Sequence, residues 1–232
     1  MSRKGAARVP DGSELVVADL VSGDGVRAAV QGVDTIVHCA SSPFRKVVQT
    51  DVEGTAMLLE LLELQPGAAK HFFYISIVGV DCIPLSYYKA KYAAEKVIGA
   101  AAVPWTILRA TQFHELLDLF FGGLSKLPIV PIFNGFRYQL LDAQECADHM
   151  AELIGGGPAG RVADIGGPDV LDLNDIANRW LAATGKRRLK IAAPMPGGFG
   201  KAMRDGLNLA PEACFGTRTW TEWLRAKYVA AH

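Results

Sequence analysis

A serine, a tyrosine and a lysine stand at a spacing that could support proton transfer. Ser76 closes an apolar run, Tyr87 follows eleven residues later, and Lys91 lies four residues beyond Tyr87. If this segment is helical, Tyr87 and Lys91 share one face, because side chains four residues apart are neighbours on a helix. A lysine ammonium beside a phenol favours the phenolate, so we expect Lys91 to lower the pKa of Tyr87 below its usual value of about 10. The spacing therefore predicts that Tyr87 can exchange a proton near neutral pH.

The hydrophobic pattern predicts that Ser76 lies at the end of a strand and that Tyr87 and Lys91 lie on the helix that follows it. Short runs rich in β-branched residues alternate with longer segments of helical spacing, which is typical of a doubly wound α/β sheet. The short runs are almost continuously apolar, as expected for a parallel sheet covered on both faces. In chain order we expect strands at 15–20, 34–40, 71–77 and 105–108, and helices at 25–31, 47–64 and 87–101.

The pattern loosens beyond Ala110, where loops rich in glycine and proline separate the apolar segments. There the spacing predicts helices at 113–121, 142–154, 173–184 and 217–229, and a short strand at 162–165. We expect this half to form a smaller lobe laid over one end of the sheet.

The composition of the chain limits the partners that we expect it to bind and the cellular compartment in which we expect it. The 232 residues carry 24 basic and 24 acidic side chains, so no bulk charge would recruit nucleic acid or an anionic membrane. The four cysteines lie far apart, which favours free thiols in a reducing compartment over disulfides or a metal site. The stretch 116–133 is too interrupted to span a bilayer, and no apolar signal segment opens the chain. We expect a cytoplasmic protein with a small-molecule substrate and possible homo-oligomers.

Six short stretches, in a consistent order, resemble one known family. They are Leu15-Val16-Val17-Ala18-Asp19-Leu20, Val37-His38-Cys39-Ala40-Ser41, Tyr74-Ile75-Ser76-Ile77-Val78-Gly79-Val80-Asp81, Tyr87-Tyr88-Lys89-Ala90-Lys91, Thr106-Ile107-Leu108-Arg109-Ala110-Thr111-Gln112-Phe113 and Ile165-Gly166-Gly167-Pro168. On the basis of these six stretches taken together, the chain resembles the atypical short-chain dehydrogenase/reductases, specifically the NmrA-like NAD(P)-binding proteins.

The resemblance implies a fold and a cofactor, NADP(H). It implies a Rossmann-type doubly wound parallel sheet over residues 1–112 and a smaller substrate lobe, interleaved with it, over 113–232. Asp19 and Leu20 would border the adenine, and Ala40 and Ser41 the adenosine ribose and the pyrophosphate. By the same resemblance, Ser2 and Arg3 would hold the 2′-phosphate of NADP, for which a guanidinium fork is well suited.

The resemblance also implies a reaction, the transfer of hydride between NADPH and a small carbonyl, enone or quinone. Tyr87 would exchange the proton, Lys91 would hold the nicotinamide ribose hydroxyls, and Ser76 would orient the substrate carbonyl. The residues implied near the nicotinamide and the substrate are Thr111, Gln112, Phe113 and His114.

One part of the family pattern is absent from this sequence. The family begins with a strand that runs into a Gly-x-x-Gly-x-x-Gly turn and a helix, which together bind the pyrophosphate. By alignment, roughly thirty residues of that pattern would precede Met1, and with them two strands that neighbour 15–20 and 34–40. We expect the working protein to be longer; the alternatives are that strand 15–20 pairs directly with 34–40, or that the fragment is unstable.

Three functional hypotheses therefore stay open at the level of sequence. The intact Tyr-x-x-x-Lys pair favours an NADP(H)-dependent oxidoreductase. The NmrA-like resemblance also allows a dinucleotide-binding redox sensor or regulator without turnover. A remnant that no longer binds cofactor would follow if this sequence is that of the mature protein.

Overall fold

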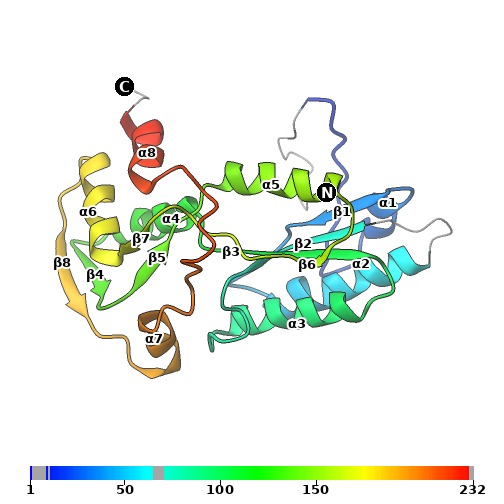
Figure 1. Cartoon of the computed structure of the whole chain (residues 1–232), viewed down its shortest axis with the longest axis horizontal. Coiled ribbons are helices and arrows are strands. Elements are labelled where there is room, and N and C mark those ends of the chain that lie inside the picture. The colour runs from blue at the N-terminus through cyan, green and yellow to red at the C-terminus, as the bar shows by residue number, and fades with distance from the viewer. Residues whose placement is uncertain (2–8, 10, 65–70, 230–232) are drawn as a thin grey trace. The chain divides into compact units, whose positions relative to one another are not determined.

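The computed structural model describes residues 1, 9, 11–64 and 71–229, and the chain divides into two compact units (Figure 1). The first unit comprises Met1–Ser76, Ser86–Ile107 and Leu153–Val162. The second comprises Ile77–Leu85, Leu108–Glu152 and Ala163–His232.

The first unit is built on a parallel sheet with the strand order β1-β2-β3-β6. The strands are β1 (Thr35–His38), β2 (His71–Ile77), β3 (Trp105–Ala110) and β6 (Gly160–Arg161). β1 pairs in parallel with β2, so that His38 lies opposite Tyr74, and β3 pairs in parallel with β6. Almost every residue of β2 is buried, as its continuous apolar pattern predicts for a strand covered on both faces. The predicted α/β fold with a parallel sheet is confirmed.

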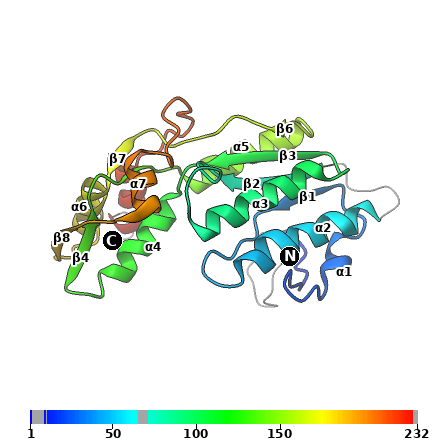
Figure 2. The ribbon, with the colours of Figure 1, turned by 90° about the horizontal axis from the view of Figure 1, so that it is seen from below.

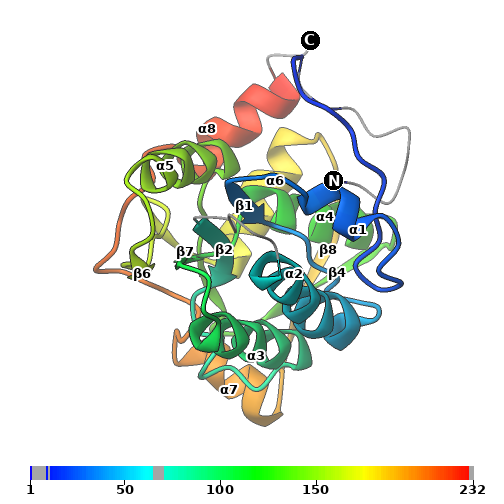
Figure 3. The ribbon, with the colours of Figure 1, turned by 90° about the vertical axis from the view of Figure 1, so that its right-hand side faces the viewer.

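Helices cover this sheet and supply most of its core. They are α1 (Val26–Val30), the π-helical turn η1 (Gln49–Glu53), α2 (Gly54–Glu63), which continues it, and α3 (Ser86–Ala100). Figures 2 and 3 show α2 and α3 side by side on one face of the strands. Leu58 and Leu62 of α2, and Ala94 and Ile98 of α3, are buried at helical spacing against the sheet. These helices lie where the apolar periodicity predicts them.

The expected strand at 15–20 is wrong. Only Val17 has bridge geometry, and the chain then turns, with the Asp19 amide donating to Asp24 O at 2.9 Å. Ala18 and Leu20 are nonetheless buried in the core. A strand requires a neighbour, and among the described strands β1 pairs only with β2. The apolar run therefore packs as an irregular segment.

The second unit combines helices with two small sheets (Figure 1). Its helical segments are α4 (His114–Leu124), α5 (Ala143–Gly155), α6 (Leu173–Ala183), α7 (Gly197–Arg204), α8 (Trp220–Leu224) and the π-helical turn η2 (Arg225–Val229). β4 (Ile129–Phe133) pairs in parallel with β8 (Leu189–Ala193), and β5 (Arg137–Gln139) pairs antiparallel with β7 (Val170–Asp172). The four helices predicted after Ala110 are confirmed, whereas α7 and both small sheets were not predicted.

The strand predicted at 162–165 is displaced. The ladder with β3 is made by Gly160 and Arg161 instead, and Ile165 makes only a single bridge, to Ala110.

None of the helices in the described ranges has both the length and the apolar character needed to cross a bilayer.

Candidate functional site

Tyr87 lies in the first turn of α3, and its hydroxyl is 2.8 Å from the hydroxyl of Ser41, in the loop after β1. Ser41 in turn donates to Oδ1 of Asp51 at 2.6 Å. Because the hydroxyl of Ser41 has one proton, which goes to the carboxylate, the Tyr87 hydroxyl must donate to Ser41. The three side chains form one directed chain, from Tyr87 through Ser41 to Asp51.

Lys91 lies one helical turn beyond Tyr87 and is buried. Its ammonium donates to the backbone oxygen of Ile75 at 2.8 Å, and it lies 4.1 Å from the centroid of the Tyr74 ring, a cation–π contact. Burial lowers the pKa of Lys91 to about 8, while the charge of Asp51 acts in the opposite direction. The lysine is therefore fixed against the backbone next to Ser76.

The expectation that Lys91 lowers the pKa of Tyr87 is wrong for this structure. Burial raises the pKa of Tyr87, and the charge of Asp51 raises it further. The ammonium of Lys91 is instead directed at Ile75 O and the Tyr74 ring. The four-residue spacing correctly puts both residues on α3, but it does not specify where their polar atoms point.

Ser76 is buried on β2, the strand whose backbone Lys91 binds. Its Oγ has no hydrogen-bond partner among the described residues. A buried hydroxyl without a partner is costly, by about 1–3 kcal/mol, and such groups are concentrated at functional sites. Ser76 thus presents a free polar atom close to the backbone that anchors Lys91.

A small cavity of about 220 Å³ opens at the end of β1. Its lining includes Asp19, Leu20, Ala40 and Ser41, the four residues that the family resemblance assigns to the adenosine and the pyrophosphate. The structure therefore brings together residues that are twenty or more positions apart in sequence. Ser41 belongs both to this cavity and to the hydrogen bond with Tyr87.

The remaining predicted site residues are not part of this group. Ser2 and Arg3 lie outside the described residues. Thr111, Gln112 and His114 are buried in the second unit, and Phe113 precedes α4 there.

His114 has the environment of a core residue. Its Nε2 donates to the backbone oxygen of Arg218 at 3.2 Å, and its ring packs against Trp220 and Trp223 with centroid distances of 5.6 Å. Burial lowers the pKa of His114. Its Nδ1 has no partner among the described residues, so one acceptor of a neutral imidazole stays unused.

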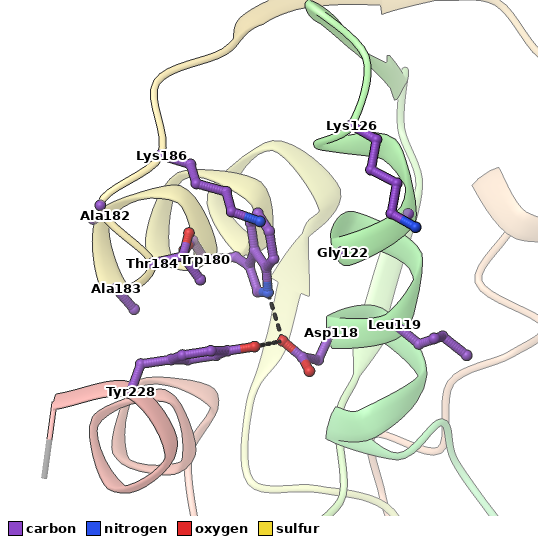
Figure 4. A pocket seen from close by; sticks show the side chains of 12 residues that line it. Asp118, Leu119, Gly122, Lys126, Trp180, Ala182, Ala183, Thr184, Lys186 and Tyr228 are labelled. Atoms are coloured by element: carbon purple, nitrogen blue, oxygen red, sulfur yellow. Dashed lines mark hydrogen bonds between the residues drawn. The ribbon is translucent and has the colours of Figure 1, made fainter. Parts of the chain in front are cut away.

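A larger cavity, of about 750 Å³, lies in the second unit between α4, α6 and η2 (Figure 4). In its wall, Asp118 accepts hydrogen bonds from Trp180 Nε1 at 2.6 Å and from the Tyr228 hydroxyl. None of the site residues predicted from the sequence is among the described residues that line it. The predicted proton-transfer residues Ser76, Tyr87 and Lys91 lie in the first unit instead.

Asp51 was not predicted as a site residue. It is fully buried, and its Oδ2 accepts the backbone amide of Ser42 at 3.0 Å. The signal was present in the sequence, because Asp51, Thr55, Leu58 and Leu62 follow one helical stripe and all four are buried. A carboxylate in an otherwise apolar stripe indicates a buried polar function.

Comparisons with known proteins show the class of domain in which these residues lie. Residues 2–116, about half of the chain, match a family model described as NAD(P)H-binding. The match includes β1, β2, α3 and β3 with Ser41, Ser76, Tyr87 and Lys91. The first half of the chain is therefore an NAD(P)H-binding domain, and a nicotinamide dinucleotide is its cofactor class. No curated protein matches the chain in sequence.

Solved structures share the fold at low sequence identity. The NADPH-dependent quinone oxidoreductase QOR2 of Escherichia coli, complexed with NADPH, is similar with a TM-score of 0.72 and 16% identity, over 91% of this chain and 82% of that one. The UDP-glucuronic acid 4-epimerase of Bacillus cereus, with UDP-glucuronic acid and NAD, has a TM-score of 0.67 and 19% identity, over 91% and 79%. RMD of Pseudomonas aeruginosa, complexed with NADPH, has a TM-score of 0.63 and 14% identity, over 97% and 91%.

The parallel sheet of the first unit agrees with the family match. Over residues 2–116 the chain belongs to the NAD(P)H-binding family, and its fold is shared with a solved short-chain dehydrogenase/reductase superfamily protein of Agrobacterium tumefaciens with bound NAD.

Proposed function

We propose that the protein is an NADP(H)-dependent oxidoreductase that transfers hydride between NADPH and a small carbonyl, enone or quinone. One observation carries the proposal: Ser41 lines the cavity at the end of β1 and also bonds to the hydroxyl of Tyr87. A dinucleotide held in this cavity would therefore reach the residue that exchanges the proton.

The residues present fit such a cofactor. Asp19, Leu20 and Ala40 would border the adenosine, and the ammonium of Lys91 would hold the hydroxyls of the nicotinamide ribose. A lysine has three donors, and Ile75 O takes one of them among the described residues. When bound, the nicotinamide supplies or accepts the hydride.

Ser76 and Tyr87 would act on the substrate. The unpaired hydroxyl of Ser76 can donate to a carbonyl oxygen, which would satisfy a buried donor and orient the substrate. Tyr87 would then give its proton to the oxygen that becomes a hydroxyl. A quinone is a suitable first probe, because a quinone oxidoreductase shares the fold.

The test combines binding with turnover. NADPH fluorescence would be titrated with the protein, and NADPH oxidation would then be followed with menadione and with benzaldehyde. We expect Tyr87→Phe to lower turnover by about 10²–10⁴-fold with the dissociation constant for NADPH unchanged. Tyr92→Phe, on the exposed side of the same helix, is the matched control and should keep full activity.

Two other results would decide against the proposal. Binding of NADPH without turnover of any carbonyl or quinone probe would favour a dinucleotide-binding sensor or regulator. Full turnover in Tyr87→Phe would remove Tyr87 from its assigned role.

A further inference from the structure

The hydroxyl of Tyr87 is the start of a hydrogen-bond chain that ends at a buried carboxylate. The distances are 2.8 Å from Tyr87 to Ser41 and 2.6 Å from Ser41 Oγ to Asp51 Oδ1. All three residues belong to the first unit, on α3, on the loop after β1 and on η1. Since Ser41 gives its proton to the carboxylate, both bonds point toward Asp51.

The carboxylate at the end of this chain is held firmly in place. Asp51 is fully buried, and its second oxygen accepts the Ser42 amide. Its backbone oxygen accepts the hydroxyl of Thr55 at 2.7 Å. Because the Thr55 proton is used there, Nε2 of His38 must be the donor in its 3.0 Å contact with Thr55 Oγ1. A charge buried with this many fixed partners is a costly arrangement, which points to a role beyond packing.

We propose that Asp51 and Ser41 form a proton relay to Tyr87, through which Tyr87 takes up or returns a proton without first becoming a phenolate. The proposal rests on the function proposed above, with Tyr87 as the residue that exchanges the proton. It adds Ser41 and Asp51 as positioning residues that act through Tyr87.

The relay moves protons only. When a substrate hydroxyl is oxidised, its proton bonds to Tyr87 Oη as the original Tyr87 proton moves to Ser41 Oγ. The Ser41 proton then moves to Asp51 Oδ1, so each hydroxyl gains one O–H bond and loses one, and the carboxylate becomes a carboxylic acid. Carbonyl reduction runs the same steps in reverse and starts from protonated Asp51. The acid proton moves to Ser41 Oγ, the Ser41 proton to Tyr87 Oη and the Tyr87 proton to the substrate oxygen, which restores the carboxylate.

The relay explains how Tyr87 could act although its surroundings disfavour its charged form. Burial and the charge of Asp51 raise the pKa of Tyr87. The other titratable groups that act on this cluster are Lys91 and Glu95 on α3, Tyr74 on β2 and Cys39 after β1. A phenol that passes its proton on as it receives another never carries the unfavourable charge.

Two substitutions separate the relay from simple adjustment of the pKa of Tyr87. Ser41→Ala removes the acceptor of the Tyr87 proton, a bond that favours the neutral phenol, so the pKa of Tyr87 should fall. Asp51→Asn removes the charge that raises this pKa, so the pKa should again fall. If the pKa alone controlled the reaction, a more acidic Tyr87 would give up its proton more readily and both variants would raise the rate of carbonyl reduction. The relay predicts instead that both variants lower turnover, by about tenfold or more.

The experiment follows the titration of Tyr87 by NMR in the full chain, with isotope-labelled tyrosine and with Tyr87→Phe to assign the signal. We expect the midpoint to fall in Ser41→Ala and in Asp51→Asn and to stay unchanged in Ser42→Ala. Ser42 is the matched control, because its hydroxyl donates to the backbone oxygen of Arg45 and not to Asp51. Turnover with the carbonyl or quinone probe is then measured for the same variants.

Ser41→Thr keeps the test decisive if Asp51→Asn fails to fold. Threonine retains a hydroxyl at this exposed position, so both the Tyr87 midpoint and turnover should return close to the wild-type values. The relay is overturned if the Tyr87 midpoint is the same in wild type and in Ser41→Ala, or if turnover rises in Asp51→Asn. Failure of the protein to bind NADPH would instead contradict the proposed function, and the midpoints would still show whether the hydrogen-bond chain exists.

Discussion

The ammonium of Lys91 lies 4.1 Å from the centroid of the Tyr74 ring, with its hydrogen bond to the backbone oxygen of Ile75. Lys91 is thus held by β2. It lies one helical turn from Tyr87, but its ammonium points at Ile75 O and at the Tyr74 ring. This arrangement leaves Lys91 in position to anchor a ribose. The hydroxyl of Tyr87 is bound by Ser41, and through it by Asp51.

The stability of the protein should depend on the protonation of Lys91. Burial lowers its pKa from 10.5 to about 8 in the folded chain. Between these two pH values the unfolded chain holds more protons, so the free energy of unfolding increases as the pH rises. Urea unfolding at neutral and at alkaline pH should show that wild type gains up to about 3 kcal/mol relative to Lys91→Met across this window. A difference that stays flat or decreases would contradict the burial of a charged Lys91.

His38 should make the fold sensitive to acid. Burial lowers the pKa of His38 to about 3, with a smaller effect of Lys91 in the same direction. The unfolded chain therefore binds more protons between pH 6.5 and 3, and stability falls as the pH decreases through this range. We expect His38→Gln, which keeps a donor for Thr55, to lose less stability on acidification, by on the order of 4 kcal/mol. Equal losses in the two proteins would mean that His38 is not buried as a neutral imidazole.

The hydroxyl of Ser76 should contribute to turnover but not to the stability of the fold. Its buried Oγ has no partner among the described residues, so Ser76→Ala should leave the free energy of unfolding unchanged or raise it by about 1 kcal/mol. The same change should lower turnover, because the substrate oxygen loses its donor. Thr106→Val is the contrast: Thr106 Oγ1 accepts the Ala159 amide at 2.9 Å and contacts Nε2 of His71, so its loss should cost about 1–3 kcal/mol. A large destabilisation by Ser76→Ala would show that its hydroxyl is bound within the fold.

Asp118 should stabilise the second unit through three donors. Its carboxylate accepts from Trp180 Nε1, from Lys227 Nζ at 2.8 Å and from the Tyr228 hydroxyl. Asp118→Ala leaves these donors unpaired, and Trp180 is almost fully buried, so urea unfolding should show a loss of about 2–3 kcal/mol. Asp118→Asn keeps an acceptor and should cost less. Equal costs for both variants would assign the effect to the charge and not to the hydrogen bonds.

The sequence predicted those parts of the fold whose pattern is local. The helix that carries Tyr87 and Lys91 and the helix that contains Leu58 and Leu62 have a clear apolar periodicity, and both are confirmed. The strand predicted for the apolar run that contains Val17 was wrong, because a strand depends on a neighbouring strand that the run itself does not encode. β4 was missed because Pro131 interrupts its apolar residues.

The residues of the candidate site were named from the sequence, but their contacts were not. The family motifs indicated Ser41 and Tyr87, and they did not indicate that the two hydroxyls meet across the fold. Burial, which raises the pKa of Tyr87, depends on the packing of α3 against η1. Asp51 could have been found from its place in the helical stripe of Leu58 and Leu62, but that stripe does not indicate its bond to Ser41.

The central claim is that the first unit binds a nicotinamide dinucleotide in the cavity that Ser41 and Ala40 line. The most direct measurement is a fluorescence titration of NADPH with the full chain, beside Ala40→Phe, whose larger side chain fills part of that cavity. We predict saturable binding to the wild-type chain and at least tenfold weaker binding to Ala40→Phe, with circular dichroism showing both proteins folded. The absence of saturable binding of NADPH and of NADH to the folded wild-type chain would contradict the account.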